Sequence, residues 1–105
     1  MIATDDILDE VVRRIVEQVH PRRVILFGSV ARGQQHSDSD LDLLVVMPDG
    51  THRRRTAQYL YAHLGSDRPP VDLVVATEAD IELHGDTPGY IYREALREGK
   101  ELYAA

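Results

Sequence analysis

Three aspartates and one glycine–serine step are the residues of this sequence whose types and spacing could perform chemistry. Gly28 and Ser29 follow a short apolar run, Asp40 and Asp42 open a second one, and Asp72 lies at the start of a third. Side chains alternate along a strand, so Asp40 and Asp42 share one face at a rise of about 3.3 Å per residue. Like charges this close repel each other, and a divalent cation is the partner that suits a group of carboxylate oxygens.

Asp72 follows the same alternation and shares its face with Val74 and Ala76. If the strands that carry Asp42 and Asp72 are neighbours, they lie about 4.8 Å apart and Asp72 joins the acidic group. Three such carboxylates can hold two Mg²⁺ ions about 3.5–4 Å apart, which stabilises both the attacking and the leaving oxygen of a phosphoryl displacement. The alternative is that Asp72 is an ordinary acid at the start of a strand.

The segment from Gly28 to Gly33 predicts a turn that binds phosphate. Gly28 lets the backbone turn sharply and lets a phosphate approach closely, while Ser29 can offer its hydroxyl and amide at the start of a helical turn. Arg32 can reach a triphosphate with its planar guanidinium, or it can pair with a surface carboxylate instead. Gly33 then allows the chain to return toward the next strand.

Two other sets of residues compete for a functional role. Asp38 stands at the same spacing from Asp40 as Asp42 does, but the apolar strand runs on directly from Asp40 and Asp42, so we interpret Asp38 as a loop or capping residue. The five histidines show no spacing typical of a zinc helix. The sequence has no cysteines, which excludes disulfides and thiolate metal sites.

Charge and hydropathy restrict the partners. The 12 basic and 18 acidic residues give a formal net charge of −6, so strong independent binding to nucleic acid is not expected. Arginines cluster at 13–14, 22–23 and 53–55, either as solvated helix faces or as contacts to phosphate or an acidic partner. No apolar stretch is long enough to span a membrane and no leader is seen, so we expect a cytoplasmic protein.

Apolar periodicity predicts the elements that must position these residues. Four helices and a helical turn are predicted. The first helix starts near Thr4 and is stopped by Pro21, and the turn covers Val30–Gly33. The other helices run from Thr51 through His63 or Leu64, near Ala79–Leu83, and from Tyr90 through Leu96 to a stop at Gly99. Strands are predicted at Arg23–Phe27, Leu41–Met47, Val71–Ala76 and Glu101–Tyr103. Thr51 and Thr77 are expected to cap the helices that follow them, Thr77 together with Asp80. This order predicts one domain over residues 1–105 of the α/β (α+β) class, a sandwich in which helices pack against a small mixed β-sheet.

The segments GSVARG at 28–33 and SDLDLLV at 39–45 resemble the signature of the minimal nucleotidyltransferases, members of the DNA polymerase β superfamily. The resemblance covers most of the chain. It implies that Asp40 and Asp42 bind both metal ions, that Asp72 completes the metal site and activates the acceptor hydroxyl, and that Gly28 and Ser29 hold the phosphates of ATP or another NTP.

The same resemblance implies a partner. Minimal nucleotidyltransferases are frequently paired with HEPN-domain ribonuclease toxins, which they neutralise in studied examples by transferring AMP to a tyrosine. We therefore expect an Mg²⁺-dependent adenylyltransferase that acts as an antitoxin. Two alternatives stay open: a binding module that blocks its partner stoichiometrically, and an antibiotic-type enzyme that modifies a small molecule. The presence of all three acids favours a protein-modifying enzyme, and 105 residues leave little chain for a small-molecule acceptor pocket.

Overall fold

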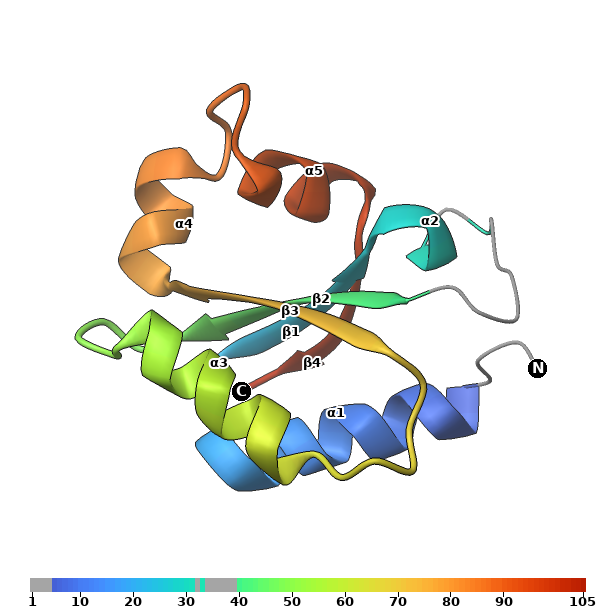
Figure 1. Ribbon diagram of the computed structural model, residues 1–105. Helices are drawn as coiled ribbons and strands as arrows, with labels where there is room; N and C mark the ends of the chain where they lie inside the picture. The colour runs from blue at the N-terminus through green and yellow to red at the C-terminus, as the bar shows by residue number, and fades with distance from the viewer. Residues whose placement is uncertain (1–4, 32, 34–39) are drawn as a thin grey trace.

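A computed structural model describes residues 5–31, 33 and 40–105, and its helices and strands follow the predicted order. They are α1 (Asp5–Val19), β1 (Arg23–Phe27), α2 (Gly28–Ala31), β2 (Leu41–Met47), α3 (Arg53–His63), β3 (Val71–Thr77), α4 (Glu78–His84), α5 (Ile91–Glu98) and β4 (Lys100–Ala104). Figure 1 shows three layers, with α4 and α5 on one side of the sheet and α1 and α3 on the other. Among these described helices, none combines the length and apolar character needed to cross a membrane.

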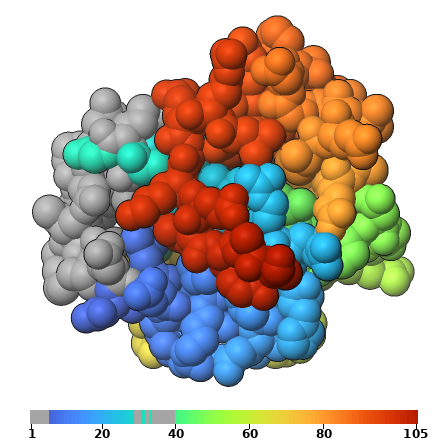
Figure 2. Space-filling view, turned by 180° about the vertical axis from the view of Figure 1, so that it is seen from behind, coloured from blue at the N-terminus to red at the C-terminus, as the bar shows by residue number. Residues whose placement is uncertain are grey.

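The four strands form one mixed sheet in the order β3-β2-β1-β4. Strand β1 runs antiparallel to both β2 and β4, whereas β2 and β3 are parallel and are joined through α3. Strands β3 and β4 are therefore the outer strands. In the rear view, β4 and α5 (red) lie across the centre of the surface, between α1 and α4 (Figure 2). The mixed sheet with helices on both faces confirms the predicted fold class.

Each face of the sheet has its own apolar core, and β2 contributes to both. Leu43 and Val45 enter the core under α1 and α3, whereas Leu44 and Val46 enter the core under α5. All four side chains are at most 1% exposed, and burying an aliphatic side chain of this size contributes about 1.5–3 kcal/mol. Strand β2 is thus held from both sides, and Asp42 shares the face of Leu44 and Val46.

The two predicted helix caps have different outcomes. Thr77 and Asp80 form a capping box, in which the Asp80 amide donates to the Thr77 hydroxyl at 3.2 Å and the Thr77 amide donates to the Asp80 carboxylate at 3.0 Å. Helix α3 is capped by His52, whose Nδ1 accepts from the Arg55 amide at 3.2 Å. The prediction for Thr51 is wrong because its hydroxyl donates to a carbonyl of the preceding turn, three residues earlier, at 2.7 Å.

Candidate active site

The predicted acids lie at the end of the sheet where β2 and β3 begin. The parallel register places Asp42 opposite Asp72, which confirms that the two acidic strands are neighbours. On the other side of β2, the antiparallel register places Asp42 opposite Phe27, the last residue of β1. Asp40 directly precedes β2. Two of the three acids therefore stand in one row across the sheet, on the face toward α5.

The three carboxylates differ in exposure. Asp40 and Asp72 are exposed, whereas Asp42 is half-buried. Within the described residues, no three acidic or histidine side chains are gathered closely enough to form a finished metal site. Asp40 and Asp72 are exposed, so their side chains can rotate toward Asp42 between staggered rotamers at small cost. The structure therefore brings Asp42 and Asp72 side by side, and the assignment of all three as metal ligands stays a prediction.

Gly28 lies directly against Asp42. Its φ of +79° is in the left-handed region, and a Cβ atom built on it would overlap the Asp42 carboxylate and lie 3.0 Å from Asp42 Cγ. Glycine is therefore required at position 28 for two reasons, the backbone conformation and the space occupied by the acid. The sequence predicted Gly28 as a point of close approach for phosphate; the structure adds that this residue makes room for Asp42.

The rest of the 28–33 segment continues from this contact. Ser29 follows Gly28 in α2, which packs against the ends of β1 and β2. Gly33 also has a φ of +79°, but open space surrounds the position where its Cβ would lie. Arg32 and Asp38 lie outside the described residues, so the roles predicted for them stay predictions. The left-handed backbone at Gly33 agrees with the turn predicted there.

The entry to β3 is fixed by contacts that sequence reasoning missed. Arg14 of α1 binds Asp67 with two nitrogens, at 2.9 and 3.1 Å, and its guanidinium holds the pKa of the Asp67 carboxyl below the ordinary value. The Leu41 amide donates to the Pro70 carbonyl at 2.9 Å. These bonds join β2 and α1 to the loop that leads to Asp72. No local pattern could reveal them, because 53 positions separate Arg14 from Asp67.

The other arginine clusters pair with acids of the chain itself. Arg13 bonds to Glu10 and Glu17 on the same helix. Further ion pairs join Arg22 to Glu78, Arg23 to Glu101 and Arg53 to Asp80. Exposed pairs of this kind contribute about 0–1 kcal/mol each. The arginines named here therefore fit solvated helix and strand faces better than a phosphate-binding surface.

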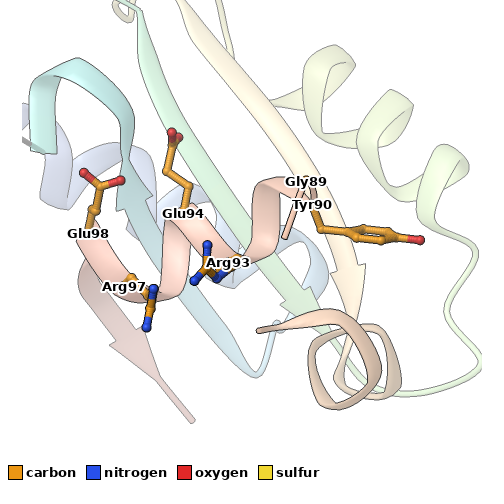
Figure 3. A pocket seen from close by; sticks show the side chains of 6 residues that line it. All are labelled: Gly89, Tyr90, Arg93, Glu94, Arg97 and Glu98. Atoms are coloured by element: carbon orange, nitrogen blue, oxygen red, sulfur yellow. The ribbon is translucent and has the colours of Figure 1, made fainter. Parts of the chain in front are cut away.

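A surface pocket of about 520 Å³ lies along α5 and does not include the predicted site residues. It is lined by Gly89, Tyr90, Arg93, Glu94, Arg97 and Glu98 (Figure 3). The two arginines and the two glutamates give it no single charge. Because its lining comes from α5 and the residues just before it, whereas the predicted chemistry lies on the sheet, the row of carboxylates is the better candidate for the active site.

Comparison with known proteins decides the family. The sequence-family model of the nucleotidyltransferase domain matches residues 8–102, which is nearly the whole chain. The chain belongs to the nucleotidyltransferase domain family. Nucleotidyl transfer is therefore its class of activity, and an NTP is its class of donor. Among curated proteins, none matches the sequence.

Several solved structures share the nucleotidyltransferase fold with this chain. A toxin–antitoxin crystal structure with AMP-PNP has a TM-score of 0.60 and 25% identity, over 92% of this chain and 73% of that chain. A protein from Sulfolobus solfataricus, named as a candidate nucleotidyltransferase, has a TM-score of 0.57 and 21% identity, over 97% of this chain and 90% of that chain. A mutant of the toxin–antitoxin pair MntA–HpeT, with two Asp-to-Glu substitutions, has a TM-score of 0.57 and 24% identity, over 98% of this chain and 75% of that chain.

Proposed function

We propose that this chain is a single nucleotidyltransferase domain that transfers AMP from ATP to a hydroxyl group of a partner protein. The observation that carries the proposal is the row formed by Asp42 and Asp72 on adjacent parallel strands, with Gly28 packed against Asp42. This row joins the phosphate-binding turn to the acids. It therefore unites the two parts of the site that a nucleotidyl transfer needs.

Asp40, Asp42 and Asp72 would hold two Mg²⁺ ions. Their donors are all carboxylate oxygens, which suit a hard cation such as Mg²⁺, and the exposure of Asp40 and Asp72 leaves these oxygens accessible. Bound ions supply neutralisation of the charge on the triphosphate and on the reacting oxygens. Gly28 and Ser29 would hold the phosphates, and Arg32 would add a cation to the triphosphate.

Asp72 acts on the acceptor. A protein hydroxyl is a weak nucleophile near neutral pH, and a carboxylate that accepts its proton makes the oxygen more reactive. The acceptor oxygen forms a bond to the α-phosphorus, the bond from that phosphorus to the bridging oxygen breaks, and pyrophosphate leaves. The hydroxyl proton passes to Asp72. Because Asp72 is on an outer strand and exposed, a protein acceptor can reach it from solvent.

The proposed partner is a toxin of the HEPN class, and the proposed acceptor is a tyrosine hydroxyl of that toxin. Supporting this, similar folds occur in toxin–antitoxin crystal structures, one of which contains the ATP analogue AMP-PNP. The net charge of −6 agrees with a protein acceptor rather than a nucleic acid. Such a reaction would take place in the cytoplasm.

The decisive experiment compares wild type with Asp72→Asn. Wild type with ATP and Mg²⁺ should raise the intact mass of the partner by about 329 Da for each AMP group transferred. This is the mass of the AMP group that stays on the acceptor after pyrophosphate leaves. Asp72→Asn should add nothing, while it keeps the fold and most of the ATP binding because Asp40 and Asp42 remain. If wild type leaves the partner unmodified, and both proteins inhibit it equally at stoichiometric ratio, the chain is a blocking module and the proposal fails.

A further inference from the structure

Tyr61 forms a hydrogen bond to the backbone beside Asp72. The amide of Leu73 donates to the Tyr61 hydroxyl oxygen, with an N···O distance of 2.8 Å. Tyr61 lies on α3 next to Leu60, which is fully buried against the sheet. Tyr61 as a whole residue is 44% exposed, so it lies at the side of the helix rather than in the core. The hydroxyl therefore joins α3 to the outer strand β3.

This bond adds an outer restraint to one particular peptide plane, which the pairing with β2 already holds on its inner side. Strand β3 has a neighbour only on the β2 side, so alternate amides of β3 point outward and have no strand to bond to. The Leu73 amide belongs to the peptide that links Asp72 to Leu73. Fixing that peptide restricts the backbone at Asp72 and so the direction of its Cα–Cβ bond. Tyr61 thus acts on the face opposite the Asp72 side chain, through the backbone.

The direction of the Asp72 side chain depends on its backbone, because no contact of the side chain itself holds it in place within the described residues. Within the described residues, no hydrogen bond or ion pair involves the Asp72 carboxylate. By contrast, the peptide before β3 is held by the bond from the Leu41 amide to the Pro70 carbonyl. The start of β3 is therefore fastened to β2 on its inner side and to Tyr61 on its outer side.

We infer that Tyr61 is a positioning residue that aims Asp72 at the metal ions and the acceptor, an inference that rests on the function proposed above. Loss of the Tyr61 bond should weaken the affinity for the metal ion that depends most on Asp72. The affinity for the ion that would bind with the triphosphate at Asp40 and Asp42 should not change. Loss of one hydrogen bond of ordinary strength corresponds to about a three- to tenfold effect on the first of these affinities.

The test compares Tyr61→Phe with Tyr59→Phe. Tyr59 is on the same helix and is 43% exposed, and its ring stacks on His63 with the ring centroids 4.0 Å apart. The Tyr59 hydroxyl has no hydrogen bond to a described residue, so removing this hydroxyl is a matched control. In Tyr61→Phe, the Mg²⁺ concentration for half-maximal AMP transfer should rise about three- to tenfold. The affinity of the protein–ATP complex for its weaker Mn²⁺ ion, measured by electron paramagnetic resonance, should fall by the same factor. Tyr59→Phe should match wild type in both.

Amide exchange separates positioning from a purely structural role. The Leu73 amide should exchange faster in Tyr61→Phe, because its acceptor is gone. Faster exchange in Tyr61→Phe can also occur while the Mn²⁺ affinity and the Mg²⁺ dependence equal those of Tyr59→Phe. In that case Tyr61 only provides a hydrogen-bond acceptor for the edge strand, and the inference is overturned. If wild type transfers no AMP, the proposed function fails instead, and the Mn²⁺ comparison still decides the role of Tyr61.

Discussion

The two ends of the sheet treat acidic side chains in opposite ways. Where β2 and β3 finish, Glu78 pairs with Arg22 at 2.7 Å, and Asp80 pairs with Arg53 at 3.1 Å and closes a capping box. Where the same strands begin, Asp40 and Asp72 have no ion pair within the described part of the chain. Carboxylates at the first end contribute to folding, whereas those at the second end are available to a ligand. Substitutions where the strands begin should therefore change the rate of AMP transfer, and substitutions where they finish should change the free energy of unfolding.

The largest effect should come from Asp40, directly before β2, and Asp42, within it. Asp40→Asn and Asp42→Asn each remove a charge that would neutralise metal ions, so each should lower the rate of AMP transfer by about a thousandfold or more. In Asp40→Asn the free energy of unfolding should stay the same or rise, because repulsion between neighbouring carboxylates is relieved. Steady-state kinetics and denaturant titration measure the two quantities.

Asp38→Asn is the control for this experiment, since Asp38 has the same spacing from Asp40 as Asp42 has. It should lower the rate less than about tenfold. A loss in Asp38→Asn as large as the loss in Asp40→Asn would show that the metal-binding pair is Asp38 and Asp40, two residues earlier in the chain.

A smaller effect should follow from adding a single methyl group at the turn proposed to bind phosphate. Gly28→Ala and Gly33→Ala both place a side chain at a φ of +79°, which costs about 1–2 kcal/mol of stability in each case. Only the methyl group at Gly28 would also displace Asp42. Gly28→Ala should therefore lower the rate at least about tenfold more than Gly33→Ala does, although both variants lose stability through the strained backbone. Equal losses of rate would show that the contact with Asp42 has no catalytic consequence.

The smallest effect should come from the opposite end of the sheet. Asp80→Ala removes the acidic half of the capping box and should lower the free energy of unfolding by about 1 kcal/mol. The Thr77 amide that donates to Asp80, helped by Arg53, holds the pKa of Asp80 below its ordinary value. A carboxyl with a lowered pKa in the folded state stabilises the fold at higher pH, and loses this contribution as the pH falls.

The difference in stability between wild type and Asp80→Ala should therefore be full near pH 7 and should shrink below about pH 4. Thermal unfolding at several pH values measures it. The rate of AMP transfer should be the same in both proteins at neutral pH. A loss of rate without a loss of stability would contradict the division of roles between the two ends.

The sequence predicted the strands well because their signal is local. Leu43, Leu44, Val45 and Val46 form an apolar run, and alternation alone assigns each of them to the correct face of the sheet. The same rule assigned Asp42 to its face, and the position of Asp72 beside it followed from the assumption that the two strands are neighbours, which the register bears out. Strand alternation and one assumption about which strands are neighbours are therefore sufficient to predict this part of the site geometry.

Other features could not be derived, because their partners are far apart in the chain or depend on exact backbone positions. Tyr61 looks like any other helix-face tyrosine until β3 is placed beside it. The bond from Arg14 to Asp67 needs the packing of α1 against the end of α3. His52, and not Thr51, caps α3, while the Thr51 hydroxyl is bonded to the previous turn. Spacing in the sequence contains none of this information.

The position of β4 sets the order in which this molecule can be completed during synthesis. Strand β1 lies between β2 and β4, and Arg23 of β1 pairs with Glu101, 78 positions later. While the ribosome is still adding the residues before Lys100, one side of β1 has no partner strand and is open to pairing with another chain. The inner strand β1 can therefore be paired on both sides only after β4 has been made and has folded back onto it.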